Sequence, residues 1–324
     1  PLSAKPQKHR IAVLMGGSSP ERTVSLKSGA ALLAALERRG YAPIAIDPYP
    51  GQDLPATLLR HQIERAVLAL HGTPGEDGSI QGMLETLQIP YTGSFVGASA
   101  LCINKTLSKR VFRDAGIPTP PWEELLLQAH DNTTTPLSLP PPYFVKPLNS
   151  GSSVGISRVA DHNSLRDGLE LAIKAGISSG QQTVRVLVEQ EIQGVELTLA
   201  VLNDTPLPLI EIRPEQGFYD FNAKYMAQKT QYIIPPAHLS QQALDRATAI
   251  GLAAGRAAGC RGLYRVDMIM DADETPWILE INTIPGMTAT SLAPKAAAAQ
   301  GLSFDDLAEQ ILAGAGLETC CAHS

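Results

Sequence analysis

Apolar and polar positions alternate in blocks along the first ninety residues. An apolar run at 11–15 ends in two glycines, and apolar residues at helical spacing follow it up to Gly40, a residue type that commonly ends helices. Apolar runs at 41–47 and 66–70 predict two more strands, and 79–87 has the spacing of a helix. Because strands that alternate with helices form parallel sheets, this part of the chain predicts an α/β domain.

Beyond residue 94 the pattern changes, because strands and long connections become more frequent. A proline-rich bend at 136–142 and a Gly/Ser loop at 148–155 flank one of these strands. We therefore expect a chain that is α/β at its start and α+β overall. The expected helices lie at 98–115, 163–175 and 241–259, and the expected strands at 143–146, 184–190, 196–202 and on both sides of 271–275.

Composition limits the classes of function. A chain of 324 residues with 44% hydrophobic and 18% charged residues is expected to fold into two or three globular domains. Its net charge of -6 disfavours nucleic acids and anionic membrane surfaces as partners. No apolar stretch approaches the ~20 residues that span a bilayer. No signal peptide is recognisable, so we expect a cytoplasmic protein.

The four cysteines lack the spacing of a disulfide framework or a zinc site and are expected to be free thiols: Cys102, Cys260, Cys320 and Cys321.

The last two expected strands carry the strongest chemical signal. Arg265 and Asp267 share one face of their strand, and Glu280 and Asn282 share one face of the next. If the strands form a hairpin that turns at 273–274, Asp267 lies opposite Glu280 and Arg265 lies opposite Asn282. Two carboxylates and an amide are ligands that suit Mg²⁺, and an arginine beside them can hold an oxyanion. The alternative is a solvated polar face with cross-strand pairs.

Two loops are ambiguous on their own. The Gly/Ser loop that follows Lys146 could wrap a phosphate with its backbone N–H groups, or it could be a flexible connector. The polar stretch at 211–236 is too long for an ordinary connection and carries Lys224 and Tyr225. It is either a loop that closes over a transferring phosphoryl group or a surface loop held down by its aromatic residues.

Five single residues are weaker candidates. Glu21 stands where an acidic residue would complement a helix dipole, and His71 ends an expected strand where a structural histidine is equally plausible. Lys105, Glu189 and Glu196 read as ordinary surface charges. None of the five indicates a function without the others.

Several motifs follow one another in order from residue 11 to about residue 312. They include GGSSPERTVSL, ALHGTPGEDGSIQGMLE, VKPLNSGSSVGIS, GFYDFNAKY, GCRGLYRVD and LEINTIPGMTATSLAPKAA. Taken together, these motifs resemble those of the D-alanine–D-alanine ligases, a family of the ATP-grasp superfamily. The resemblance implies an ATP-grasp fold with a parallel α/β domain at 1–94, a small central domain at 95–188 and an antiparallel-sheet domain at 189–324.

The resemblance also implies a reaction and its participants. Two D-alanines would be joined through a D-alanyl phosphate, with release of ADP and phosphate, for the synthesis of peptidoglycan precursors. ATP and two Mg²⁺ ions would be required, with Mn²⁺ as a possible replacement, and the protein would be a homodimer. For the nucleotide and the metal, the implied residues are Lys105 and Lys146 at the phosphates, Glu189 at the adenine, Glu196 at the ribose, and Asp267, Glu280 and Asn282 at Mg²⁺.

The same resemblance assigns the D-alanine contacts. Glu21 would receive the ammonium of the first D-alanine, and His71 would lie near its carboxylate. Lys224 would neutralise charge on the transferring phosphoryl group. The remaining implied roles are Ser152 and Tyr225 in a network with Glu21, Arg265 and the Gly286 N–H in an oxyanion hole, and Ser291 and Leu292 at the carboxylate of the second D-alanine.

Three positions depart from the family pattern, and two other functions compete. Asn104 precedes the helix lysine where relatives often have aspartate, Phe221 replaces a tyrosine, and Gln190 replaces a lysine. One rival function is a D-alanine–D-lactate or other depsipeptide ligase, which Tyr225 disfavours. The other is a non-catalytic nucleotide-binding regulator, which the intact set of Mg²⁺-ligand candidates disfavours.

Overall fold

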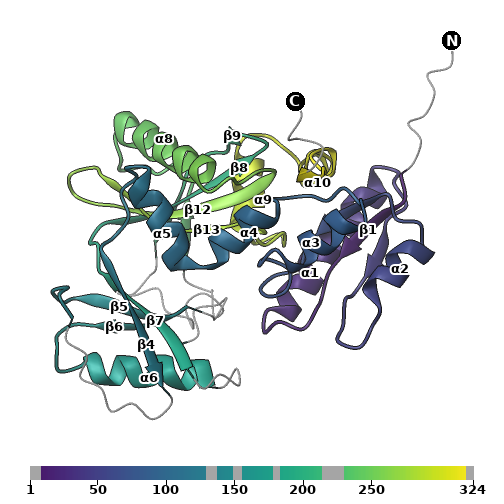
Figure 1. Cartoon of the computed structure of the whole chain (residues 1–324). Helices are drawn as coiled ribbons and strands as arrows, with labels where there is room; N and C mark the ends of the chain where they lie inside the picture. Colours follow the sequence, from purple (N-terminus) through teal and green to yellow (C-terminus); the bar gives the residue numbers. More distant parts are fainter. Residues whose placement is uncertain (1–8, 129–136, 149–154, 178–182, 214–229, 319–324) are drawn as a thin grey trace.

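A computed structural model describes residues 9–128, 137–148, 155–177, 183–213 and 230–318 of the chain. Its strands form three sheets that lie in different parts of the molecule (Figure 1). The sheet of the C-terminal half lies between the N-terminal sheet and the central one. The mixed α/β architecture that the sequence predicts is confirmed. The boundaries at 94 and 188 stay a prediction.

The N-terminal sheet is parallel, as the alternation of strands and helices predicts. Its middle strand is buried at every residue, because neighbouring elements cover both of its faces. One helix, α2, was not expected, although its start carries two common signals: Asp53 at the N-cap and a proline in the first turn. The elements are β1 (Ile11–Leu14), α1 (Arg22–Arg38), β2 (Ile44–Ile46), α2 (Leu54–Arg60), β3 (Arg65–Leu68) and α3 (Ser79–Thr86).

The central sheet is antiparallel and carries one described helix, on the face turned away from the C-terminal sheet (Figure 1). Its strand order is β4-β7-β5-β6. Apolar residues of the strands pack against α6 in a core of their own. The elements are β4 (Trp122–Gln128), β5 (Tyr143–Pro147), β6 (Ser157–Val159), α6 (Leu165–Ile177) and β7 (Thr183–Gln190).

The third sheet has the order β11-β10-β8-β12-β13, with β9 beside β8, and its described pairings are antiparallel. One face packs on α8, and part of the other packs on α9 and α10. The elements are β8 (Val195–Leu202), β9 (Thr205–Pro206), β10 (Ile210–Arg213), β11 (Gln231–Ile233), α8 (Gln241–Ala257), β12 (Leu263–Met270), β13 (Pro276–Asn282), α9 (Leu292–Ala299) and α10 (Phe304–Ala313).

The single helix expected at 98–115 is wrong, because the chain forms two helices there. These are α4 (Val96–Ile103) and α5 (Lys105–Asp114). Asn104 lies between them with an extended backbone, and its side chain accepts the N–H of Leu107 at 3.1 Å, which makes it the N-cap of α5. The break places Lys105 in the first turn of a new helix.

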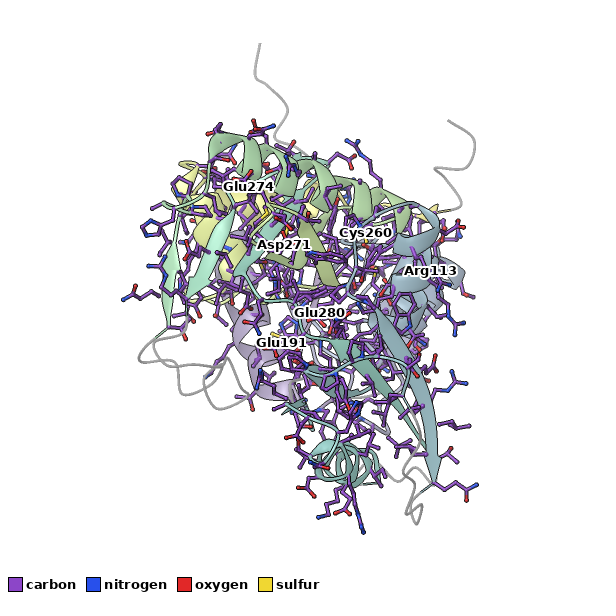
Figure 2. All side chains as sticks on the ribbon, turned by 90° about the vertical axis from the view of Figure 1, so that its left-hand side faces the viewer. Arg113, Glu191, Cys260, Asp271, Glu274 and Glu280 are labelled. Carbon is purple, nitrogen blue, oxygen red and sulfur yellow. The ribbon has the colours of Figure 1, made fainter. Side chains whose placement is uncertain are left out.

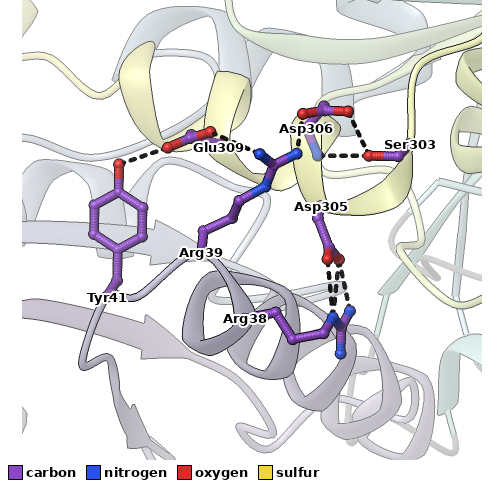
Figure 3. A network of polar contacts seen from close by, with 7 residues as sticks. All are labelled: Arg38, Arg39, Tyr41, Ser303, Asp305, Asp306 and Glu309. Atoms are coloured by element: carbon purple, nitrogen blue, oxygen red, sulfur yellow. Dashed lines mark hydrogen bonds and ion pairs between the residues drawn. The ribbon is translucent and has the colours of Figure 1, made fainter.

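Helix α1 is anchored to the C-terminal part of the chain. It shares a buried apolar core with α9 and α10 that includes Leu32 and Leu36. A polar network reinforces this contact (Figure 3): Arg38 donates to both carboxylate oxygens of Asp305, and the Tyr41 hydroxyl donates to Glu309 at 3.0 Å. Exposed ion pairs contribute little individually, so the apolar core is the main anchor. The N-terminal helix is thereby held beside the third sheet.

Two expectations from composition can be compared with the structure. Within the described residues, none of the helices has both the length and the apolar character that crossing a membrane requires. Cys102 and Cys260 are free, as expected, with their Sγ atoms 3.6 Å apart in the core under α8. Cys320 and Cys321 lie outside the described residues.

Candidate active site

One face of the β12–β13 hairpin carries the predicted polar cluster. Asp267 lies opposite Glu280 and Arg265 lies opposite Asn282, so both predicted pairs are confirmed. Figure 2 shows Glu280 where the third sheet meets the central one. The hairpin turn lies well away from it, near the labelled side chains of Asp271 and Glu274. The site is therefore at the junction of two sheets.

A β-bulge aims Glu280 into this site. Past Asp267 the register shifts, so that Met268 pairs with Ile278 and Leu279 is an extra residue. In an unbroken strand Ile278 and Glu280 would share a face. The bulge instead leaves Ile278 in the core beneath α8 and places Glu280 on the polar face, a use of bulges that is common next to active sites.

Both carboxylates of the cluster are paired with cations. Arg265 holds Asp267 through two hydrogen bonds of 2.8 and 2.7 Å, and Thr198 donates to the same carboxylate at 2.6 Å. Lys105 Nζ lies 2.5 Å from Glu280 Oε2. Burial disfavours the charge of Lys105, but the attraction of Glu280 outweighs it and raises the pKa of the lysine. The site therefore balances negative groups against positive ones at close range.

The donor set of this face fits a hard divalent cation. Within the described residues no three His, Cys, Asp or Glu side chains cluster as a metal centre, so a metal would depend on Asn282 and on phosphate oxygens in addition to Asp267 and Glu280. Asn282 Oδ1 accepts the N–H of Ile284 at 3.0 Å and keeps a second lone pair. Mg²⁺ takes oxygen ligands of this kind and usually shares them with substrate phosphates.

A second charged cluster lies beside the first, centred on the buried carboxylate of Glu189. Lys146 contacts one of its oxygens, and Lys109 Nζ lies 3.0 Å from the other. Burial alone would raise the pKa of Glu189, but the two lysines outweigh this effect and lower it. Lys109 was not predicted, although it follows Lys105 by four residues and so shares a face of α5. Glu196 lies on the same face of β8 as Thr198, which is opposite Asp267.

Two carboxylates from the N-terminal part of the chain lie on either side of Gly72. A side chain at Gly72 would lie only 3.2 Å from Glu21 Oε2, so the Glu21 carboxylate is packed against this glycine. On the other side Gly72 N–H donates to Glu76 at 2.6 Å. Burial, with a further contribution from Glu21, raises the pKa of Glu76 to about 7. Glu76 was also not predicted, although it lies in the HGTPGEDG motif.

His71 lies in this region but is fully engaged by the protein. Its ring nitrogens are 3.0 Å from Ser28 Oγ and 3.0 Å from the Ile284 carbonyl oxygen. Burial lowers the pKa of His71 to about 4, with a smaller contribution in the same direction from Arg265. A neutral imidazole with both nitrogens bonded is suited to positioning other groups.

The loop after β13 brings Gly286 to the start of α9. A side chain at Gly286 would lie 2.9 Å from Ser291 Oγ, so the two residues are in contact. Ser291 Oγ accepts the Thr288 N–H at 3.0 Å and stands at the N-cap of α9, whose first helical residue is Leu292. Backbone N–H groups at a helix start favour an anion such as a carboxylate. Ser152, Lys224 and Tyr225, like Phe221, lie outside the described residues.

His71 and Glu76 should affect stability with opposite pH dependence. Below its ordinary pKa of 6.5, His71 is protonated in the unfolded chain but not in the folded protein until about pH 4, so stability falls as the pH drops through this window. Glu76 keeps its proton up to about pH 7 in the folded protein but loses it above 4.5 when unfolded, so stability falls as the pH rises. The two effects nearly cancel in the wild type.

Replacing Glu76 by glutamine should expose the effect of His71. We expect the free energy of unfolding of Glu76→Gln to fall by about 2–3 kcal/mol more than that of the wild type between pH 6.5 and pH 4.5. Urea denaturation at the two pH values measures this difference. Parallel changes in the two proteins would show that Glu76 does not titrate as its burial requires.

Comparisons with known proteins cover nearly the whole chain. Models of the D-ala D-ala ligase N-terminus and C-terminus match residues 49–94 and 111–313. The D-alanine–D-alanine ligase of Magnetococcus marinus is 49% identical over 317 residues, which are 96% of this chain and 99% of that protein. The enzyme of Nitrosomonas europaea is 43% identical over 97% of this chain and 98% of its own length. The crystal structure of the Bacillus anthracis ligase complexed with ATP superposes with a TM-score of 0.78 at 34% identity, covering 95% of this chain and 97% of that one.

Proposed function

Because this chain belongs to the D-alanine–D-alanine ligase family and joins two D-alanines at the expense of ATP, we propose that the reaction passes through a D-alanyl phosphate formed beside the polar face of β12 and β13. The observation that supports this most strongly is the pairing of Arg265 with Asn282 and of Asp267 with Glu280 at the junction of two sheets. The product is a peptidoglycan precursor. Incubation with D-alanine, ATP and Mg²⁺ should release phosphate together with a dipeptide that mass spectrometry identifies.

ATP is proposed to bind between the two lysine–carboxylate clusters. Lys105 and Lys146 would hold its phosphates, Glu189 the adenine amino group and Glu196 the ribose. Lys105 is paired with Glu280, and Lys146 with Glu189. Phosphate oxygens would compete for these lysines on binding. Glu189 would then keep Lys109 as its partner, and Glu280 would be paired with the proposed Mg²⁺.

The residues that would hold Mg²⁺ are Asp267, Glu280 and Asn282. The family pattern implies two Mg²⁺ ions, with Mn²⁺ as a possible replacement. The metal would supply positive charge to the phosphate groups during transfer. Arg265 orients Asp267 through the two hydrogen bonds described above. The protein thus positions part of the donor set.

In the first step a carboxylate oxygen of the first D-alanine attacks the γ-phosphorus of ATP. A new O–P bond forms while the bond to the leaving ADP oxygen breaks. Glu21 is proposed to hold the ammonium of this D-alanine, with Ser152 and Tyr225 extending its network and Lys224 neutralising the transferring group. Exclusion of water is needed here, because water would hydrolyse the acyl phosphate.

In the second step the deprotonated amine of the second D-alanine attacks the acyl carbon. The carbonyl oxygen becomes an oxyanion, for which Arg265 and the Gly286 N–H are the proposed donors. The C–O bond then breaks, and phosphate departs with the electron pair. Ser291 and Leu292, at the start of α9, are proposed to hold the carboxylate of the incoming D-alanine.

The depsipeptide alternative gives a prediction for Tyr225. Tyr225→Phe removes one hydroxyl from the proposed network with Glu21. The loss of this hydrogen bond should reduce the free energy of closing the loop over the substrate by about 0.5–1.5 kcal/mol. We expect the ratio of D-alanyl-D-lactate to D-alanyl-D-alanine to rise when both nucleophiles compete in one reaction. Product ratios at acidic, neutral and alkaline pH measure this shift.

Tyr41→Phe is the matched control, because it removes a tyrosine hydroxyl that bonds Glu309 on α10. Its product ratio should equal that of the wild type. If Tyr225→Phe also leaves the ratio unchanged, Tyr225 does not govern the choice of nucleophile. A cytoplasmic location, a homodimeric state and the lack of nucleic-acid and membrane partners remain proposals.

A further inference from the structure

A buried chain of hydrogen bonds joins α1 to the loop after β13. Ser28 is fully buried in the middle of α1, and its Oγ accepts the Met287 N–H at 3.0 Å. The same Oγ lies 3.0 Å from His71 Nε2, and His71 Nδ1 lies 3.0 Å from the Ile284 carbonyl oxygen. Ile284 and Met287 flank Gly286, so the loop is fixed on both sides of this glycine.

The direction of each hydrogen bond follows from its partners. The Ile284 carbonyl can only accept, so His71 carries its proton on Nδ1. A neutral imidazole then presents a lone pair on Nε2, which must accept from the Ser28 hydroxyl. The Ser28 oxygen still has a lone pair for the Met287 N–H. Each donor in this series of hydrogen bonds therefore faces an acceptor.

We infer that Ser28 is a positioning residue for the oxyanion hole: with His71, it clamps the 284–287 segment so that the Gly286 N–H points at the reacting carbonyl. The inference rests on the oxyanion role proposed for Gly286. Glycine has the widest backbone freedom of any residue, so its N–H direction depends on the anchors on either side. Oxyanion donors are effective only when they are held in place before charge develops.

Ser28→Ala tests the clamp, because it removes both the donor to His71 and the acceptor for Met287. We expect kcat to fall about 3- to 10-fold, the equivalent of one neutral hydrogen bond, while KM for ATP stays within about 2-fold of the wild type. ATP binds through other residues, so only the chemical step should suffer. Steady-state kinetics of the full-length protein at saturating D-alanine give both constants.

Ser99→Ala is the matched control. Ser99 is equally buried on a helix, and its hydroxyl donates to the Ser94 carbonyl at 3.2 Å, away from the 284–287 segment. Both variants lose one buried hydroxyl, so both should lose thermal stability. Only Ser28→Ala should lose kcat; equal kcat values for the two variants at matched melting temperatures would overturn the inference.

A second measurement does not depend on activity. Long-range ¹H–¹⁵N spectra of the ¹⁵N-histidine-labelled protein distinguish the two neutral imidazole tautomers. We expect His71 in the wild type to show the Nδ1–H form, and Ser28→Ala to shift the Nε2 resonance as it loses its donor. A proton on Nε2 in the wild type would refute the chain of bonds. A failure of the proposed function would appear as an inactive wild type, whereas the spectra would still report the tautomer of His71. Failure of the proposed function and failure of this inference are therefore distinguishable.

Discussion

Replacing Glu280 by glutamine should remove nearly all turnover and leave the fold intact. The change keeps the shape of the side chain but deletes one negative charge from the proposed Mg²⁺ ligands, on a strand whose register is fixed by its pairing with β12. We expect kcat to fall at least about 10²-fold, or roughly 3 kcal/mol of transition-state stabilisation, and the Mg²⁺ concentration for half-maximal rate to rise. Rates over a Mg²⁺ titration, with circular dichroism as a check on folding, measure the effect.

The same substitution also breaks the ion pair with Lys105, so a control must lose an ion pair without losing a ligand. Glu124→Gln on β4 does this, because Glu124 is paired with Arg110 and Arg185 at 3.4 and 3.1 Å on the central sheet. It should keep near wild-type kcat. A Glu280→Gln protein with normal rates at saturating Mg²⁺ would exclude Glu280 as a ligand.

Replacing Arg265 by alanine should cost about 10² to 10³ in kcat, as the loss of one oxyanion donor does in other enzymes. Arg265 also holds Asp267, so part of the loss could come from a misplaced metal ligand. Saturating Mg²⁺ separates the two contributions. A donor to the oxyanion is still missing when the metal sites are full, so we expect most of the loss to persist.

Arg213→Ala is the control for this variant. Arg213 bonds Glu211, two residues earlier on β10, so its removal also breaks an arginine–carboxylate pair within one strand. Glu211 lies opposite Leu197, which packs in the core under α8, so this pair is on the other face of the sheet. Its removal should leave kcat unchanged. If Arg265→Ala raised only KM for ATP, Arg265 would bind nucleotide instead of the oxyanion.

The cluster on β12 and β13 could be predicted because side chains alternate along a strand with a strict period. That period, together with the position of the turn, is enough to place Asp267 opposite Glu280, where the two strands indeed pair them. The bulge at Leu279 could not be predicted in this way, since one extra residue leaves no mark on so short a pattern. The break at Asn104 was missed: asparagine is a common N-cap residue, but the spacing of apolar residues across it favoured one continuous helix.

Buried polar residues on helices and loops were harder to predict. Lys109, Glu76 and Ser28 look like surface residues in the sequence, because their partners lie far along the chain or are backbone atoms. Lys109 contacts Glu189, eighty positions further along the chain, and Ser28 accepts the N–H of Met287, which lies 259 positions away. Such pairings are decided by tertiary packing, which local propensity does not encode.

Isotope transfer tests the central claim, activation of the first D-alanine as an acyl phosphate, most directly. D-Alanine with both carboxylate oxygens replaced by ¹⁸O is converted to dipeptide in unlabelled water, and the released phosphate is analysed by mass. If the carboxylate attacks phosphorus and the amine then breaks the C–O bond, one labelled oxygen leaves with each phosphate. We predict one ¹⁸O per phosphate. Unlabelled phosphate at full dipeptide yield would contradict the proposed intermediate.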